Sequence, residues 1–130
     1  MPNVGAFVDV EQFLIDNLSI GVPVSTRIPT SNPKPARFVR VIRTGGTRQT
    51  RVSDRPIVTI EAFAQTETGA SGLLSDLRSA MAALEGRAIA GVTVYDVAEV
   101  GGPVNLPHPT VTDRQRYTAT FEIQIRGVLT

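Results

Sequence analysis

The sequence of 130 residues contains no cysteine, one histidine and few aromatic residues. Without cysteine, neither a disulfide framework nor a thiolate metal site can form. The single histidine, His108, stands between two prolines with no nucleophile or orienting acid beside it, so we expect an exposed loop histidine without a catalytic role. No stretch approaches the roughly 20 apolar residues that cross a bilayer, and the first residues lack the pattern of a secretory signal. We therefore expect a soluble chain that is not exported, with no metal, cofactor or membrane partner.

Motifs for phosphate binding and for acid–base catalysis are also missing. The pairs Gly45-Gly46 and Gly101-Gly102 do not lead into a helix, as nucleotide-binding loops do, and we interpret them as backbone turns that need positive φ. A glycosidase-like pair of carboxylates would have to lie inside a cleft, whereas alternation predicts that Glu122 faces solvent. We expect that the protein is not an enzyme.

The composition that remains is that of a folded globular protein. Hydrophobic residues make up 42% of the chain and charged residues 19%, which argues against global disorder. A chain of this length buries about two-thirds of its unfolded surface in one core. We expect a single domain over residues 1–130, from which a basic loop protrudes at 44–55.

Positive charge is concentrated in one stretch. Residues 27–55 carry eight basic side chains and one acidic one, although the net charge of the whole chain is only +1. This asymmetry indicates a charged interface, either with an acidic protein or with nucleic acid. Stacking aromatics for single strands are missing, and the planar fork of arginine suits carboxylates, so we favour a protein partner over DNA. The candidate interface residues are Arg40, Arg43, Arg48, Arg51 and Arg55.

Hydrophobic periodicity predicts two helices and five strands. The helices are expected at 10–18, with Asp9 as N-cap and Gln12 as its capping-box partner, and at 67–84, with a continuous apolar stripe. The strands are expected at 22–28, 37–43, 56–63, 92–100 and 116–126. Residues 44–55 and 101–109 are interpreted as loops.

This order of elements predicts an α+β fold. We expect a mostly antiparallel sheet of about four to five strands with two helices packed on one face. Pro23 removes a backbone donor, so the strand at 22–28 belongs at an edge, and the last strand is the other candidate edge. Unpaired edges accept a neighbour's strand, which makes the first strand a possible contact between subunits. Its residues on one side are Val22, Val24, Thr26 and Ile28.

Two groups of residues carry a family resemblance. The first is Arg37-Phe38-Val39-Arg40-Val41 with Arg43-Thr44-Gly45-Gly46, followed by Asp54-Arg55-Pro56 and Val58-Thr59-Ile60-Glu61-Ala62. The second is Val100-Gly101-Gly102-Pro103-Val104-Asn105-Leu106-Pro107, followed by Arg116-Tyr117-Thr118 and Arg126-Gly127. Together they resemble the tail terminator proteins of long-tailed, siphovirus-like bacteriophages, especially those of actinobacterial hosts. The resemblance spans nearly the whole chain, and its motifs are structural.

The resemblance implies a virion protein of the tail and neck region, assembled in the host cytoplasm. It would form a homo-hexameric ring that ends polymerisation of the tail tube, binding the tail tube protein on one side and the head-completion or connector protein on the other. Genomic DNA would pass through the lumen. Two alternatives stay open, namely another phage neck or head-completion protein and, in a different class, a small DNA-binding module. In the ring, we expect the basic loop to contact other virion proteins.

Overall fold

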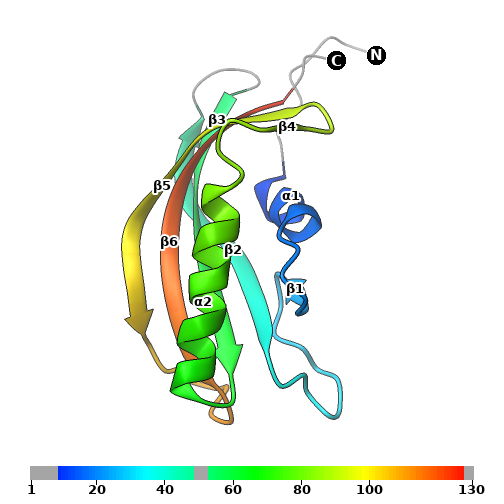
Figure 1. Ribbon diagram of the computed structural model, residues 1–130, viewed down its shortest axis with the longest axis vertical. Coiled ribbons are helices and arrows are strands. Elements are labelled where there is room, and N and C mark those ends of the chain that lie inside the picture. The colour runs from blue at the N-terminus through cyan, green and yellow to red at the C-terminus, as the bar shows by residue number, and fades with distance from the viewer. Residues whose placement is uncertain (1–8, 49–52, 128–130) are drawn as a thin grey trace.

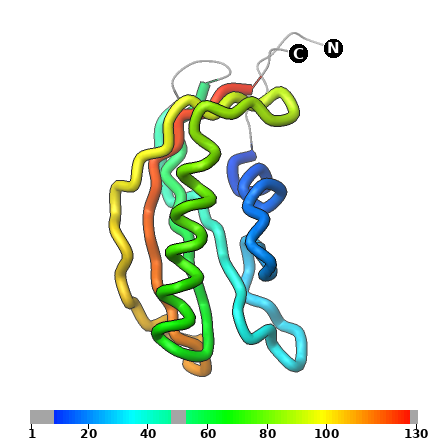
Figure 2. Tube along the Cα trace, viewed as in Figure 1, coloured from blue at the N-terminus to red at the C-terminus, as the bar shows by residue number. Residues whose placement is uncertain are grey.

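The computed structural model describes residues 9–48 and 53–127. One curved sheet forms one layer of the molecule, and both helices pack on the same face of it (Figures 1 and 2). The elements are α1 (Val10–Asn17), β1 (Val24–Ser25), β2 (Phe38–Arg48), β3 (Ser53–Ala64), α2 (Glu67–Ala82), β4 (Ala88–Ile89), β5 (Val92–Asn105) and β6 (Gln115–Arg126).

The strands form a six-stranded mixed sheet in the order β1-β2-β3-β6-β5-β4. The predicted α+β class is confirmed, but the expected four to five antiparallel strands are corrected to six strands with one parallel pair. β1 runs parallel to β2 because the connection over residues 26–37 is long enough to return the chain in the same direction. The last strand, β6, lies between β3 and β5 and not at an edge, so that part of the prediction is wrong.

Both helices begin at side-chain caps. The carboxylate of Asp9 accepts a hydrogen bond from the amide of Gln12 at 3.1 Å, and the hydroxyl of Thr66 accepts one from the amide of Gly69 at 3.0 Å. These bonds satisfy amides that have no partner within the first turn. The predicted capping box does not form, because the Gln12 side chain donates to Asp16 instead.

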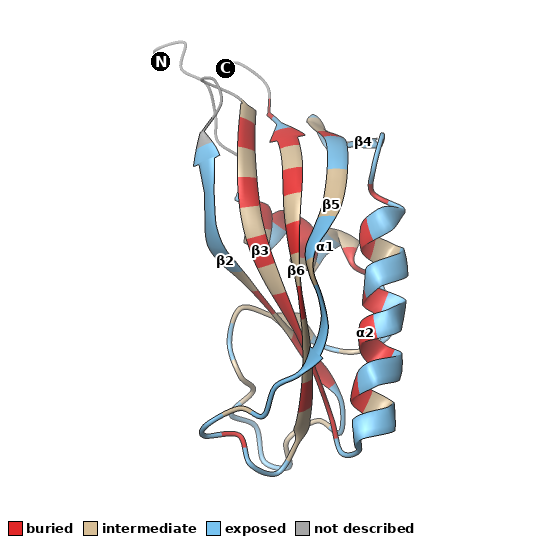
Figure 3. Ribbon diagram, turned by 90° about the vertical axis from the view of Figure 1, so that its left-hand side faces the viewer, coloured by how far each residue is buried: buried red, intermediate tan, exposed pale blue. Residues whose placement is uncertain are grey.

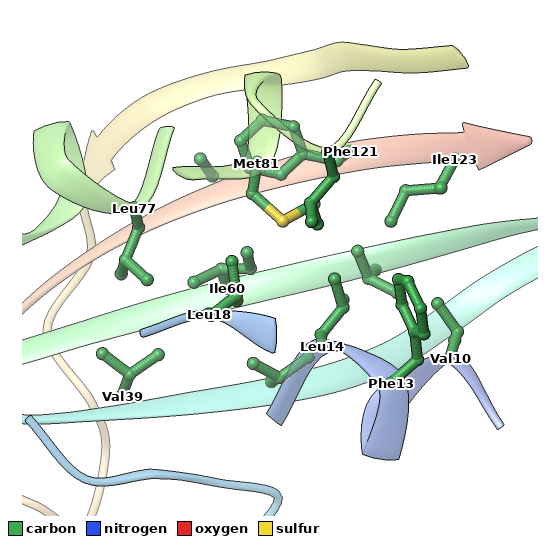
Figure 4. Close-up of a cluster of buried hydrophobic side chains, with 14 of the residues drawn as sticks. Val10, Phe13, Leu14, Leu18, Val39, Ile60, Leu77, Met81, Phe121 and Ile123 are labelled. Carbon is green, nitrogen blue, oxygen red and sulfur yellow. The ribbon is translucent and has the colours of Figure 1, made fainter. Parts of the chain in front are cut away.

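The main core lies between the helices and one face of the sheet (Figure 4). Val58, Ile60 and Ala62 are fully buried on the core face of β3, as their alternation predicts. α2 contributes Leu77 and Met81, and the opposite wall comes from α1. Both helices of the described residues lie on this side of the sheet, and we call the other side the open face (Figure 3).

The expected loop at 44–55 is for the most part strand. β2 continues to Arg48 and β3 begins at Ser53, so that Thr47 pairs with Arg55. The glycine pair does not make a turn; it absorbs a register shift that follows Arg43. Gly46 has φ +109°, and a Cβ there would clash with the carbonyl oxygen of Arg55, so only glycine lets the ladder continue.

The second glycine pair also lies within a strand. β5 extends to Asn105, past the predicted end at residue 100 and into the segment interpreted as a stiff loop. The short strand β4 was not predicted. It pairs with β5 through a two-residue turn in which Ala90 and Gly91 both have positive φ, at 50° and 83°. A turn of this kind usually has the sequence Asn-Gly. Here alanine takes the place of asparagine, so the sequence pattern that predicts a hairpin is missing.

A second, smaller core closes one end of the open face. Phe38 and Phe63 stack there with ring centroids 4.6 Å apart, and Val111 joins them. Val111 belongs to the connection between β5 and β6, which crosses this end of the sheet. An ion pair of 3.0 Å between Lys34 and Asp113 ties this connection to the one between β1 and β2. The rest of the open face has no cover among the described residues.

Candidate protein interface

Three of the five candidate arginines are paired inside the molecule. Arg43 lies at the end of the helix-bearing face and binds Asp54 through two hydrogen bonds of 2.7 and 3.1 Å. Arg55, on the open face, donates to the side-chain oxygen of Gln124 at 3.1 Å and lies 3.6 Å from a carboxylate oxygen of Glu122. Because residues across neighbouring strands face the same side, the sheet itself brings these opposite charges together.

The third arginine belongs to a buried cluster on the open face. Arg116 donates to Glu61 at 2.5 Å, and both side chains are about nine-tenths buried. Arg116 also donates to the carbonyl oxygen of Leu106 at 2.6 Å. Arg40 lies on the other side of the carboxylate, with 3.4 Å between its Nε and Oε1 of Glu61, but the alignment is too poor for a hydrogen bond. The cluster holds the β5–β6 connection onto the sheet.

The remaining two candidates lie outside what the structure describes, Arg51 entirely and Arg48 in its side chain. Their role at an interface stays a prediction. The sequence showed a segment with a large positive charge, whereas the folded sheet offsets the charge of Arg40, Arg43 and Arg55 with buried or half-buried carboxylates. Sequence reasoning missed this because the partners lie on other strands, and which side chains meet depends on the register between the strands.

His108 is half-buried and not an exposed loop residue, which corrects the prediction. Its Nδ1 accepts hydrogen bonds from the amides of Thr110 and Val111, both at 3.1 Å, and its ring packs on Phe63 with centroids 5.9 Å apart. Burial lowers the pKa of His108, and the nearby positive charge of Arg116 lowers it further. The side chain therefore acts as a neutral acceptor that shapes the loop.

A row of small side chains crosses the uncovered part of the open face. The hydroxyls of Thr44 and Thr59 are 3.3 Å apart, and those of Thr59 and Thr120 are also 3.3 Å apart. Gly101 continues the row on β5, opposite Thr120. Such a row is uncharged, and its polar groups are matched to one another.

The predicted edge strand is at the edge, but only two of its residues are strand. β1 lies first in the sheet order, as Pro23 suggested, and the carbonyl of Pro23 accepts the amide of Val39 at 2.9 Å. Val22 and Val24 pack against the main core, and Ile28 packs against the smaller one. Thr26, between them, is half-buried. The role of these residues in a subunit contact stays a prediction.

The other edge of the sheet is apolar and was not predicted. The large hydrophobic side chains that are exposed in the described part of the chain all lie on β5 or directly after it: Tyr95, Val100, Val104 and Leu106. Three of them fall in or beside the segment that its glycines and prolines made us interpret as a loop. The available signal was the recurrence of apolar residues at positions 100, 104 and 106.

Beside this edge, a shallow groove of about 350 Å³ separates α2 from β5. Arg78 and Glu99 bridge it with hydrogen bonds of 2.6 and 2.9 Å, and this bonding raises the pKa of Arg78. Over residues 9–48 and 53–127, the acids and the histidine form no group of three that could hold a metal ion. None of the helices described has the length and apolar character to cross a membrane.

Comparison with known protein families matches residues 6–130 to a family described as phage tail termination protein. The chain belongs to this family. The match covers nearly the whole chain and confirms the resemblance seen in the sequence. The protein is therefore a phage tail component that acts in tail termination, and the surfaces described above are those of a tail terminator. A search of curated proteins finds no match.

Proposed function

We propose that this tail terminator forms a ring, with six copies, at the head-proximal end of the tail tube. The ring stops addition of tube subunits and provides the docking surface for the head-completion or connector protein. Genomic DNA passes through its lumen. The observation that carries the proposal is the family match over residues 6–130.

The two edges of the sheet support a ring in particular. A ring closes through a head-to-tail contact, in which each copy uses two different surfaces. One edge of this sheet is short and covered, with β1 and α1 beside β2, and the other is the long, apolar β5. In a head-to-tail contact, one of these edges would bind the other, different edge of the next copy.

The pairing of Arg40, Arg43 and Arg55 argues against a DNA-binding surface built on these three side chains. Neutralising phosphates requires cations that are free to bind them. Arg40, Arg43 and Arg55 instead face carboxylates of their own chain.

We keep Arg48 and Arg51 as the residues that contact the tail tube or the connector, and charge reversal at both should weaken docking while the fold stays intact. Purified protein should bind duplex DNA only weakly, without a steep dependence on salt; tight, salt-sensitive binding would instead support the DNA-binding module.

Loss of the gene during phage assembly tests the proposed position of the protein at the head-proximal end of the tail. A terminator that is missing leaves overlong tails, or tails without heads, in electron micrographs of lysates. Complementation with the intact gene should restore a single tail length. Tails of normal length beside heads that leak DNA would overturn the proposal and place the protein among the head-completion components.

A further inference from the structure

The outer edge of β5 has no strand partner over most of its length. β4 pairs with β5 only through Val92 and Thr93, and the amide of Val97 is bonded to the side chain of Glu85 at 3.0 Å. From residue 98 to residue 105 no described strand pairs with this side. At the opposite edge, β1 pairs with β2 through Val24 and Ser25, and the carboxylate of Glu11 on α1 accepts the amide of Arg43 at 2.8 Å.

The same edge is also where the apolar surface lies. Val100 is 57% exposed, and Val104 and Leu106 are each 50% exposed. Single exposed hydrophobic residues are ordinary in a soluble protein, but a group of them on one unpaired edge strand marks an interaction surface. Figure 3 shows β5 exposed along this stretch, beside the outer side of α2.

We propose that the β5 edge, with the adjoining side of α2, binds the β1 edge of a second copy of this chain and is the contact that closes the ring. The inference rests on the proposed function and names the surfaces it uses. Its occupant is a second copy, because the charges left over on the two edges are opposite in sign.

The unpaired charges are arranged as follows. On the β5 side, Asp96 has no side-chain partner among the described residues, and the carboxylate of Glu85 accepts the amide of Val97. The exposed cation Arg87 lies at the β4 end of this edge, so two carboxylates stand against one guanidinium group. Beside β1, Arg27 and Arg37 are exposed and likewise have no side-chain partner within 9–48 and 53–127. Carboxylates on one side and guanidinium groups on the other favour head-to-tail pairing and disfavour two β5 edges meeting each other.

The surface is large enough for such a contact. Ten residues from Val97 to Leu106 span roughly 33 Å at about 3.3 Å per residue. The helix layer and the sheet layer are each about 10 Å thick, so the strand and the flank of α2 together give a width of about 20 Å and roughly 650 Å² per partner. This area is above the about 500 Å² per partner that a specific interface needs. β5 has register shifts around Gly101, and such bulges oppose a long backbone ladder. The contact is therefore made mainly by side chains.

Because the chain contains no cysteine, thiol cross-linking tests the contact directly. The variant carrying both Val104→Cys and Arg37→Cys is built into phage tails and treated with a short bis-maleimide. We expect a ladder of cross-linked species up to the size of the ring, while each single variant stays monomeric. Dimers from Val104→Cys alone would show two β5 edges facing each other and would overturn the proposal.

A charge substitution gives the second readout. Val100→Glu with Val104→Glu should weaken ring assembly on tails by roughly a hundredfold or more, because two carboxylates would be buried against a neighbour. The control is Thr112→Glu, which adds a charge at an exposed position of the β5–β6 connection and should leave assembly unchanged. Circular dichroism of the purified variants confirms that each remains folded.

The failure of this contact and the failure of the proposed function give different results. If the wild-type protein caps tails as a ring while the cysteine pair gives no ladder and the double glutamate variant assembles normally, the contact is wrong and the ring stands. If gene loss leaves tail length unchanged, the proposed function fails whatever the cross-linking shows.

Discussion

Replacing Arg116 by methionine should destabilise the protein strongly, because it leaves a carboxylate buried. The side chain of Glu61 is 6% exposed, and Arg116 provides its one short hydrogen bond at 2.5 Å. Removing one partner of a buried ion pair costs about 3–5 kcal/mol. Arg40 remains 3.4 Å away and offsets part of the charge, so we place the loss near the lower end, at about 3 kcal/mol.

This loss converts into a large shift of the melting temperature. Unfolding entropy of about 2.1 cal/mol/K per residue gives roughly 0.27 kcal/mol/K for a chain of this length, so about 3 kcal/mol lowers Tm by about 11 °C. Thermal and guanidinium unfolding followed by circular dichroism measure the change. Arg78→Met is the control, since it removes an arginine from an exposed pair with Glu99 and should lower Tm far less.

A double variant decides whether the buried charge is the cause. With Glu61→Met added to Arg116→Met, no carboxylate is left behind, and the double variant should recover at least about 1 kcal/mol relative to the single one. If the double variant is no more stable than Arg116→Met, the loss comes from the bond to the Leu106 carbonyl or from packing. The reasoning about Glu61 would then be refuted.

Three further predictions concern the backbone and pH. Gly46→Ala should cost about 1–3 kcal/mol in unfolding experiments because of positive φ and a clash with the neighbouring strand, whereas Gly45→Ala, with open space around it, should be nearly neutral. Ala90→Asn should stabilise the protein by about 0.5 kcal/mol, since asparagine tolerates the left-handed conformation that alanine adopts there. Because the folded pKa of His108 is lowered, the unfolded state binds more protons, and stability should fall as pH drops through about 6.5. Unfolding curves between pH 7.5 and 5 should show a weaker fall for His108→Asn, and an unchanged slope would contradict the assignment.

Local patterns predicted most of the fold. The N-cap of α1 at Asp9, the buried face of α2 and the alternation along β6 follow from neighbours within a few residues, so a single sequence displays them. The position of β6 in the middle of the sheet does not follow, because strand order depends on which distant segments pair. The glycine pairs were misjudged for a related reason: glycine permits both a turn and a bulge, and only the partner strand decides between them.

The candidate interface was only partly predictable. Composition located the basic segment correctly. It could not show that several of its arginines form ion pairs with carboxylates of the same chain. Asp54 lies eleven positions after Arg43, Glu61 lies twenty-one after Arg40, and Glu122 lies sixty-seven after Arg55. The pairings join different strands, and they come from the sheet register.

The two edges of the sheet show how the pairing of charges within the fold affects which surface is suited to an interface. The segment that looked most like an interface in the sequence uses several of its arginines to hold β2 and β3 in register, and the edge with the exposed apolar surface carries little charge. Burying β5 against a neighbour would remove from water the exposed valines and leucine that the isolated chain leaves uncovered. Burying the paired arginines would gain less, since their carboxylates already satisfy them. Apolar contact on β5 is therefore the better source of affinity between copies, and unpaired charges at the rim are suited to setting the orientation of each copy.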